Sequence, residues 1–136
     1  MISKSFELNK LKLKNYKFFL FYGDNEGLKE ENIKNLFEKN YQNKIYRYEE
    51  KEVLDNIDIF FNSILTKSFF DNEKLIIVNR TTDKIRTTIE DLIEKNPKDI
   101  KIILNSKNLE KKSTLRKLFE KEKSIVCIPF YEDNNQ

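Results

Sequence analysis

Five short apolar segments recur along the chain, with stretches of helical periodicity between them. The apolar segments lie at residues 17–22, 44–48, 74–78, 100–104 and 124–128. Most of them are apolar at nearly every position, which is typical of strands covered on both faces in a parallel sheet. Residues 44–48 instead alternate between apolar and polar side chains, so we expect a more exposed strand there.

The intervening segments place apolar residues three or four positions apart. This spacing predicts helices at residues 26–39, 50–65, 85–95 and 111–122. Strands that alternate with helices over short connections require right-handed crossovers and parallel pairing. The pattern therefore predicts an α/β fold, with a five-stranded parallel sheet sandwiched by helices.

The chain has 136 residues, a length that suits one domain with one core. We expect a basic segment at residues 1–16, a folded domain at residues 17–130, and the start of a linker to a following domain at residues 131–136. No segment approaches the roughly 20 apolar residues of a membrane span, so we expect a cytoplasmic protein without a membrane partner.

Histidine is absent from the sequence, and this removes whole classes of chemistry. Without imidazole there is no histidine base, no Ser-His or Cys-His pair and no histidine ligand for a metal. Cys127 is the only cysteine, so no disulfide can form within the chain. It lies in an apolar segment, where we expect a buried, unreactive thiol.

Gly23 opens a turn between the first strand and the first helix, the place that a phosphate-binding loop occupies. That motif needs a second glycine five positions later, followed by lysine and a hydroxyl residue. Here Leu28 replaces the second glycine, Lys29 stands in register, and Glu30 replaces the hydroxyl residue. We expect that this loop does not bind nucleotide; the alternative is an ordinary strand-to-helix turn that needs glycine's backbone freedom.

Ser68, Phe69 and Phe70 stand in the connection between the second helix and the third strand. Two large aromatic residues in a connection either turn inward and join the core, or stay exposed and mark a partner site. The residues alone leave both interpretations open.

The last helix and the connection before it carry more basic than acidic residues. The basic residues are Lys107, Lys111, Lys112, Arg116, Lys117, Lys121 and Lys123, against Glu110, Glu120 and Glu122. Such a patch can contact nucleic-acid phosphates, and a solvated helix face is the alternative interpretation. The candidates for DNA contact are Lys111, Lys112, Arg116 and Lys117.

Three stretches together resemble the N-terminal domain of the delta subunit of the bacterial DNA polymerase III clamp loader, in its alphaproteobacterial branch. They are KFFLFYGDNEGLKEENIKNLF at residues 17–37, ILTKSFFDNEKLIIVNR at residues 64–80, and DIKIILNSKNLEKKSTLRKLFEKE with the following SIVCIPFYEDN at residues 99–134. They cover most of the chain, and their order and spacing carry the resemblance.

The resemblance implies an AAA+-like P-loop fold whose delta member has lost nucleotide binding, in agreement with Leu28 and Glu30. It also implies a subunit that opens the ring-shaped sliding clamp, or beta subunit, of the DNA polymerase III holoenzyme. In relatives a hydrophobic pair, often Leu-Phe after a serine, enters a pocket on the clamp. Phe69 takes the Leu position and Phe70 the Phe position of that motif, after Ser68.

A whole delta subunit would continue into a lid domain and into a collar domain that joins the other loader subunits. The leading hypothesis is therefore a non-catalytic clamp-binding domain with no cofactor, a component of a machine that handles primed DNA. The alternatives are an active P-loop ATPase and a phospho-receiver domain. Both would need an acidic residue at the end of the third strand, where Asn79 and Arg80 stand.

Overall fold

The computed structural model describes residues 1–2, 13–39, 41–66 and 73–131 of the chain. Five strands form one sheet in the order β2-β3-β4-β1-β5, and every adjacent pair is parallel. The strands are β1 (Phe18–Tyr22), β2 (Ile45–Glu49), β3 (Lys74–Asn79), β4 (Ile100–Asn105) and β5 (Ile125–Pro129). The predicted five-stranded parallel α/β fold is confirmed.

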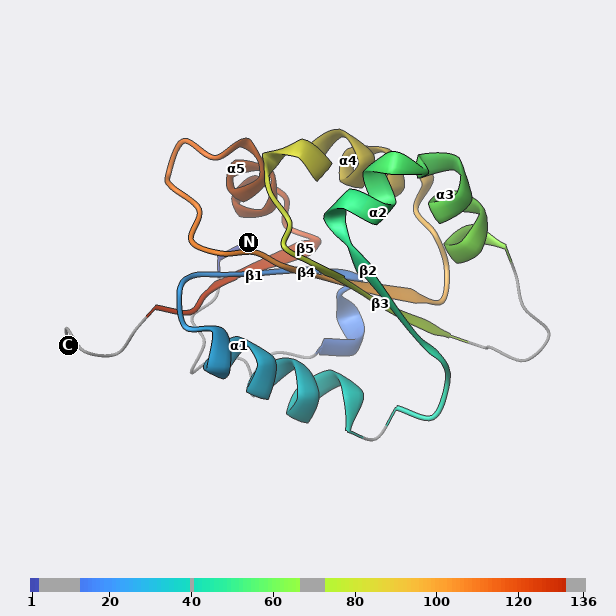
Figure 1. Cartoon of the computed structure of the whole chain (residues 1–136), viewed down its shortest axis with the longest axis horizontal. Helices are drawn as coiled ribbons and strands as arrows, with labels where there is room; N and C mark the ends of the chain where they lie inside the picture. The colour runs from blue at the N-terminus through green and yellow to red at the C-terminus, as the bar shows by residue number, and fades with distance from the viewer. Residues whose placement is uncertain (3–12, 40, 67–72, 132–136) are drawn as a thin grey trace.

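Helices cover both faces of the sheet (Figure 1). On one face lie α1 (Glu26–Ile33), its π-helical continuation η3 (Lys34–Glu38) and the short turn η2 (Leu13–Asn15). On the other face lie α2 (Glu50–Asp55), α3 (Ile57–Leu65), the turn η4 (Asp83–Ile85), α4 (Arg86–Lys95) and α5 (Thr114–Lys121). The longest described helix, α4, has ten residues, so none of these helices is long enough to cross a bilayer.

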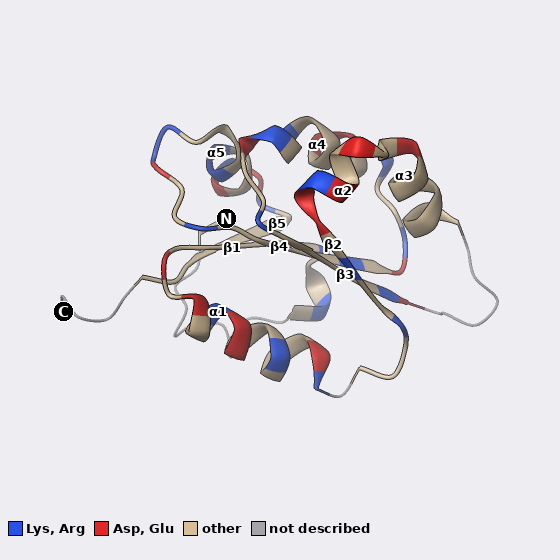
Figure 2. Cartoon of the chain, viewed as in Figure 1, with Lys and Arg blue, Asp and Glu red and all other residues tan. Residues whose placement is uncertain are grey.

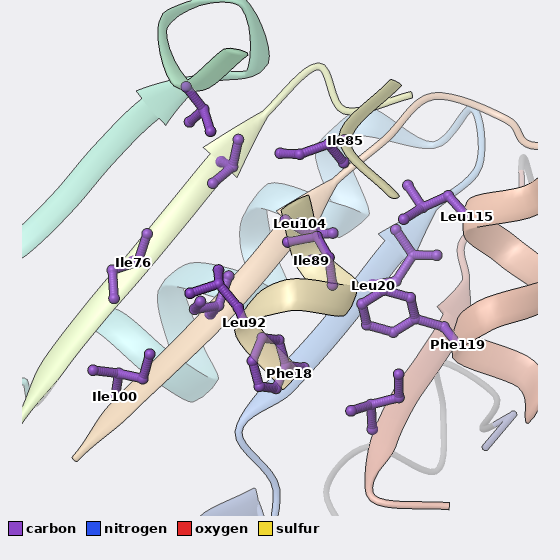
Figure 3. Packing of buried hydrophobic residues seen from close by; sticks show 14 of the residues in the cluster. Phe18, Leu20, Ile76, Ile85, Ile89, Leu92, Ile100, Leu104, Leu115 and Phe119 are labelled. Atoms are coloured by element: carbon purple, nitrogen blue, oxygen red, sulfur yellow. The ribbon is translucent and has the colours of Figure 1, made fainter. Parts of the chain in front are cut away.

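The core consists of two apolar layers, one on each face of the sheet. Alternate residues of β1 serve different layers: Phe18 and Leu20 face α2 to α5, whereas Phe19 and Phe21 face α1. Figure 3 shows the larger layer, to which helices α4 and α5 contribute Ile89, Leu92, Leu115 and Phe119. Because both faces of β1 are buried, its continuous apolar sequence is explained.

The helix predicted at residues 50–65 is two helices, α2 and α3, so that part of the prediction was wrong. The chain bends at Asn56, which has φ −144° and ψ 62° and whose carbonyl accepts the Phe60 amide at 3.0 Å. Asn56 thus ends one helix and begins the next, because asparagine favours helix ends over helix interiors. Apolar spacing missed the break because Val53, Phe60 and Ile64 stay buried on both sides of it.

Helix α5 begins at Thr114 rather than at residue 111. Ser113 precedes it, and its hydroxyl accepts the Arg116 amide at 3.2 Å, a standard N-cap. Lys111 and Lys112 therefore belong to the turn before the helix.

Cys127 lies in β5 and is fully buried, as predicted. Desolvation raises the pKa of its thiol to about 12, so the reactive thiolate is suppressed at neutral pH. Its amide donates to the Met1 carbonyl at 2.8 Å, and Ile2 forms an isolated parallel bridge with it. The first two residues of the chain therefore lie along the outer edge of β5.

Candidate functional site

The turn at Gly23 is tightly closed against the residue that follows β5. Gly23 has φ 124°, and a β-carbon there would lie 2.6 Å from the carbonyl carbon of Phe130. Only glycine fits both the backbone conformation and the space. The same residue therefore serves a packing role in the position that begins a phosphate-binding motif.

The backbone amides of this turn already donate within the chain. Gly23 donates to the Lys107 carbonyl at 3.3 Å, and Asn25 donates to the Phe130 carbonyl at 3.0 Å. At the start of α1, the amides of Leu28 and Lys29 donate to the side chain and the carbonyl of Asn25, each at 3.1 Å. A phosphate loop needs such amides free to surround the phosphate.

Lys29, which stands in register with the phosphate-binding lysine of the motif, is fully buried. Its ammonium donates to the Ser106 carbonyl at 2.5 Å and forms an ion pair with Glu26 at 2.5 Å. The lysine thus joins α1 to the end of β4 instead of pointing to an open site. Leu28 is half-buried against the layer under α1, and Glu30 is exposed.

A cavity of about 240 Å³ lies at the carboxyl ends of β2, β3 and β4, and Glu26, the ion-pair partner of Lys29, lines it. Its lining residues are Glu26, Glu30, Glu49, Asn79, Arg80, Asn105 and Lys107. The side-chain amide of Asn105 donates to that of Asn79 at 3.1 Å, and Arg80 pairs with Glu49 at 2.7 Å. Asn79 is an amide where either alternative function would need an aspartate, so the end of β3 carries no acidic group, although glutamates line other sides of the cavity.

Polar contacts at the carboxyl edge of the sheet join the loops that follow its strands. Glu50 accepts the amide of Thr82 at 2.5 Å and its hydroxyl at 2.8 Å, and the hydroxyls of Thr81 and Ser106 share a hydrogen bond. These contacts connect the start of α2 with the segments that follow β3 and β4. These hydrogen bonds therefore join neighbouring loops at the carboxyl edge of the sheet.

Asp83 fixes the beginning of α5 to the segment after β3. Its carboxylate accepts the Ser113 hydroxyl at 2.5 Å and the Leu115 amide at 3.0 Å. Desolvation alone would raise the pKa of Asp83, but hydrogen bonds from Ser113, Leu115 and Thr114 and the charge of Arg86 lower it below its ordinary value. The folded structure therefore stabilises the ionised carboxylate of Asp83.

The candidate DNA-contacting residues have different environments. Lys111, Lys112 and Lys117 are exposed at the start of α5 and before it. Arg116 instead donates to the Leu109 carbonyl and to Glu120, each at 2.9 Å, and its guanidinium lies 5.0 Å from the centre of the Tyr22 ring. Arg116 therefore has a structural role within the domain.

Acidic and basic residues are interleaved along the helices. Figure 2 shows both charges along α1 and along α2 in this view, and Lys112 pairs with Glu110 at 3.5 Å. Around α5, Lys112 and Arg116 each have a carboxylate partner, Glu110 and Glu120, so the basic excess there is partly balanced.

The candidate clamp-binding residues Ser68, Phe69 and Phe70 lie outside the described residues. The elements on either side of them are described. Helix α3 ends at Leu65, which is 39% exposed, and also carries Ile59, which is 63% exposed. Glu73 is the next described residue, and β3 begins at Lys74.

Lys74 was not among the residues that the sequence singled out. Its side chain is buried and its ammonium donates to the carbonyls of Ser63 and Thr66 at the end of α3. The available signal was a lysine at the first position of an apolar strand, a few residues after the end of a helix. Periodicity treats such a lysine as a polar boundary.

The five parallel strands and the turn after β1 define an α/β domain with an arrangement like that of P-loop proteins. In this domain, backbone amides of the loop already donate to other groups of the chain. A family model described as DNA polymerase III, delta subunit, matches residues 19–128, so the chain belongs to that family. The resemblance to the delta subunit seen in the sequence is thereby confirmed, whereas its assignment to the alphaproteobacterial branch stays a prediction.

The fold is similar to the solved structure of the Bacillus subtilis DNA clamp loader delta protein (YqeN), with a TM-score of 0.71 and 17% sequence identity. The match covers 94% of this chain and 42% of that one, so this chain spans less than half the length of the solved protein. A search of curated proteins found no match.

Proposed function

We propose that this chain is the clamp-contacting domain of a clamp-loader delta subunit, which binds the sliding clamp and helps to open it during DNA replication. The family match carries the proposal, because it extends over residues 19–128 and so includes the connection between α3 and β3. Within that connection, Ser68, Phe69 and Phe70 are the proposed clamp-binding residues.

The chemistry of the surface next to this connection supports a protein partner. Ile59 and Leu65 of α3 expose apolar area on the helix that leads into it. Aromatic residues beside such area are suited to act as anchors, because burying an aromatic side chain in a partner pocket contributes a large share of binding energy. Binding energy that is larger for the open ring than for the closed ring would shift the clamp towards opening.

The closed phosphate-loop position supports a domain without a catalytic site of its own. The amides at Gly23, Asn25 and Leu28 donate within the chain, and Lys29 is paired with Glu26. A nucleotide would have to break these contacts and approach the carboxylates of Glu26 and Glu30. The domain then acts within the polymerase holoenzyme by binding rather than by hydrolysis.

The remaining partners belong to the assembled loader. The other loader subunits would be joined through parts of a delta subunit beyond this chain. Lys111, Lys112 and Lys117 are exposed and available for primed DNA, whereas Arg116 is held by Leu109 and Glu120.

The direct test is binding of the 136-residue chain to the cognate sliding clamp, measured by surface plasmon resonance. We expect saturable binding that Phe70→Ala abolishes or strongly weakens. Tyr131→Ala is the matched control, because Tyr131 is an aromatic residue that is 50% exposed and follows β5 at the carboxyl edge of the sheet. Absence of binding by the unmodified chain would contradict the proposal.

A further inference from the structure

Lys74 connects the end of α3 with the start of β3. Its ammonium donates to the carbonyl of Ser63 at 2.9 Å and to that of Thr66 at 2.6 Å, and the residue is only 6% exposed. Its backbone amide donates to the Asp99 carbonyl at 2.8 Å, at the point where β3 joins β4. The side chain is thus rooted in the sheet and bonded to the helix.

The site is chemically suited to an ammonium group. The last carbonyls of a helix lack partners within it, and the C-terminal end carries a partial negative charge. The ring of Tyr46 lies 5.7 Å from the Lys74 nitrogen and adds a second favourable contact. No ion pair joins Lys74 to a carboxylate among the described residues, so carbonyl dipoles and the ring are the partners found for its charge.

Thr66 and Lys74 also bracket the connection that contains the proposed clamp-binding residues. One side chain therefore holds both ends of that connection at a fixed separation. Fixing the ends reduces the conformations open to the residues between them, and so lowers the entropic cost of ordering those residues on a partner. We propose that Lys74 is a positioning residue for the clamp contact, an inference that rests on the proposed function.

Lys101 offers a matched comparison elsewhere in the fold. It lies in β4, and its ammonium donates to the carbonyls of Leu13 at 2.8 Å and Tyr16 at 3.3 Å, with the Phe19 ring at 5.8 Å. The chemistry is the same: a strand lysine joins two carbonyls of a helical turn beside an aromatic ring. Lys101 anchors the turn η2 on the other face of the sheet, so its loss should affect stability without affecting the clamp contact.

The experiment measures clamp affinity and thermal unfolding of the 136-residue chain with Lys74→Met, Lys74→Arg and Lys101→Met. Methionine keeps most of the side-chain volume but cannot donate, whereas arginine keeps the charge and can donate to two carbonyls. We expect Lys74→Met to weaken clamp binding about 5- to 20-fold per folded molecule. Lys74→Arg should recover affinity to within about threefold, and Lys101→Met should lower the melting temperature with affinity unchanged within about twofold.

The outcomes separate the two proposals. If the unmodified chain does not bind the clamp, the proposed function fails. If it binds and Lys74→Met binds equally well, or if Lys101→Met weakens binding as much, the positioning role of Lys74 is wrong. Should Lys74→Met fail to fold, Lys74→Gln against Lys74→Arg gives the same decision, because glutamine keeps a donor and loses the charge.

Discussion

The two ends of the sheet differ in how many polar groups bond within the chain and in how much apolar area is exposed. At the carboxyl ends of the strands, Lys29, Asp83 and Glu50 all bind groups of the same chain, and the turn at Gly23 touches Phe130 directly. On α3, Ile59 and Leu65 expose apolar side chains, and the Lys74 ammonium donates to two carbonyls at the end of that helix.

This difference separates an edge of the sheet whose polar groups bond within the chain from a helix that exposes apolar area. The end that would carry nucleotide chemistry is filled by internal hydrogen bonds, which stabilise the loops and leave few groups for a ligand. On α3, by contrast, Ile59 and Leu65 are exposed among the described residues. Exposed apolar side chains next to a short connection are what a protein-binding surface needs.

The strongest test of the comparison sets two phenylalanines near α3 against each other. Phe60 is buried in the core, so Phe60→Ala should lower the free energy of unfolding by about 3 to 5 kcal/mol. Phe70→Ala should weaken clamp binding by about 2 to 4 kcal/mol, roughly 30- to 1000-fold, with little change in stability. Urea unfolding and clamp titration of both variants decide the matter. A core-sized stability loss in Phe70→Ala, with unchanged affinity per folded molecule, would assign Phe70 to the core.

Glycine substitutions probe the closed turn at the carboxyl edge. Gly23→Ala should destabilise the domain by about 2 to 4 kcal/mol, because φ is 124° and the new β-carbon would overlap the Phe130 backbone. Gly27→Ala is the control: a β-carbon there approaches only the Asn25 side chain, at 4.0 Å, and the position is helical. We expect it to stabilise by about 0.5 to 1 kcal/mol. Equal effects in calorimetry would show that the turn is not closed as described.

Removal of the buried lysine tests the polar network itself. Lys29→Met should cost about 1 to 3 kcal/mol, because it leaves the Ser106 carbonyl buried without its charged donor. Lys34→Met, an exposed lysine in the η3 turn that continues α1, should change stability by less than about 0.5 kcal/mol. The free energy of unfolding in urea measures both. If Lys29→Met left the free energy of unfolding unchanged, the contact of Lys29 with the Ser106 carbonyl would not contribute to stability.

A smaller, pH-dependent effect is expected at Asp83. Since the folded state lowers the pKa of this carboxyl, its contribution is present above the unfolded-state value near pH 4 and is lost as pH falls through the lower folded-state value. Asp83→Asn should cost about 1 kcal/mol at pH 7, as for loss of a helix cap, and should flatten the acid limb of the stability curve. Chemical unfolding between pH 2 and pH 7 checks this. If Asp83→Asn loses stability with falling pH as steeply as the unmodified chain, Asp83 does not contribute to the acid sensitivity.

The last prediction is that nucleotide has no effect on thermal stability. Millimolar Mg-ATP should leave the melting temperature of the domain unchanged, because the amides and the lysine of the loop are already bonded within the chain. A ligand that binds the native state raises the melting temperature by mass action. A reproducible rise of several degrees would show that the carboxyl edge opens to nucleotide.

Much of the fold was predictable from the sequence because buried parallel strands carry a continuous apolar signal. Phe18 and Phe19 serve opposite layers, so the run at β1 has no polar gaps to mislead the assignment. The break at Asn56 was not predictable from spacing, since the apolar residues on both sides keep helical steps. The register of Leu28, Lys29 and Glu30 against the phosphate motif could be counted from the residues alone.

The partners of the polar residues were beyond the sequence. Lys29 stands among glutamates in a surface helix, which predicts an exposed lysine, yet its acceptor on Ser106 lies 77 residues away. Lys74 likewise finds its carbonyl acceptors only because α3 folds back over the start of β3. Such contacts depend on tertiary placement, which no local pattern encodes. The role of Ser68, Phe69 and Phe70 stays a prediction.

The strand order affects how this protein folds during its synthesis on the ribosome. Strand β1 is made early but pairs only with β4 and β5, with Phe18 opposite Ile102 and Ile125. At 5–20 residues per second, the roughly 80 residues that separate β1 from β4 take about 4 to 16 s to synthesise. For that time the sequence Phe-Phe-Leu-Phe-Tyr has no native strand to join, and it has the composition of an aggregation-prone segment. Slower translation or loss of β5 should therefore increase dependence on chaperones that shield nascent apolar chains.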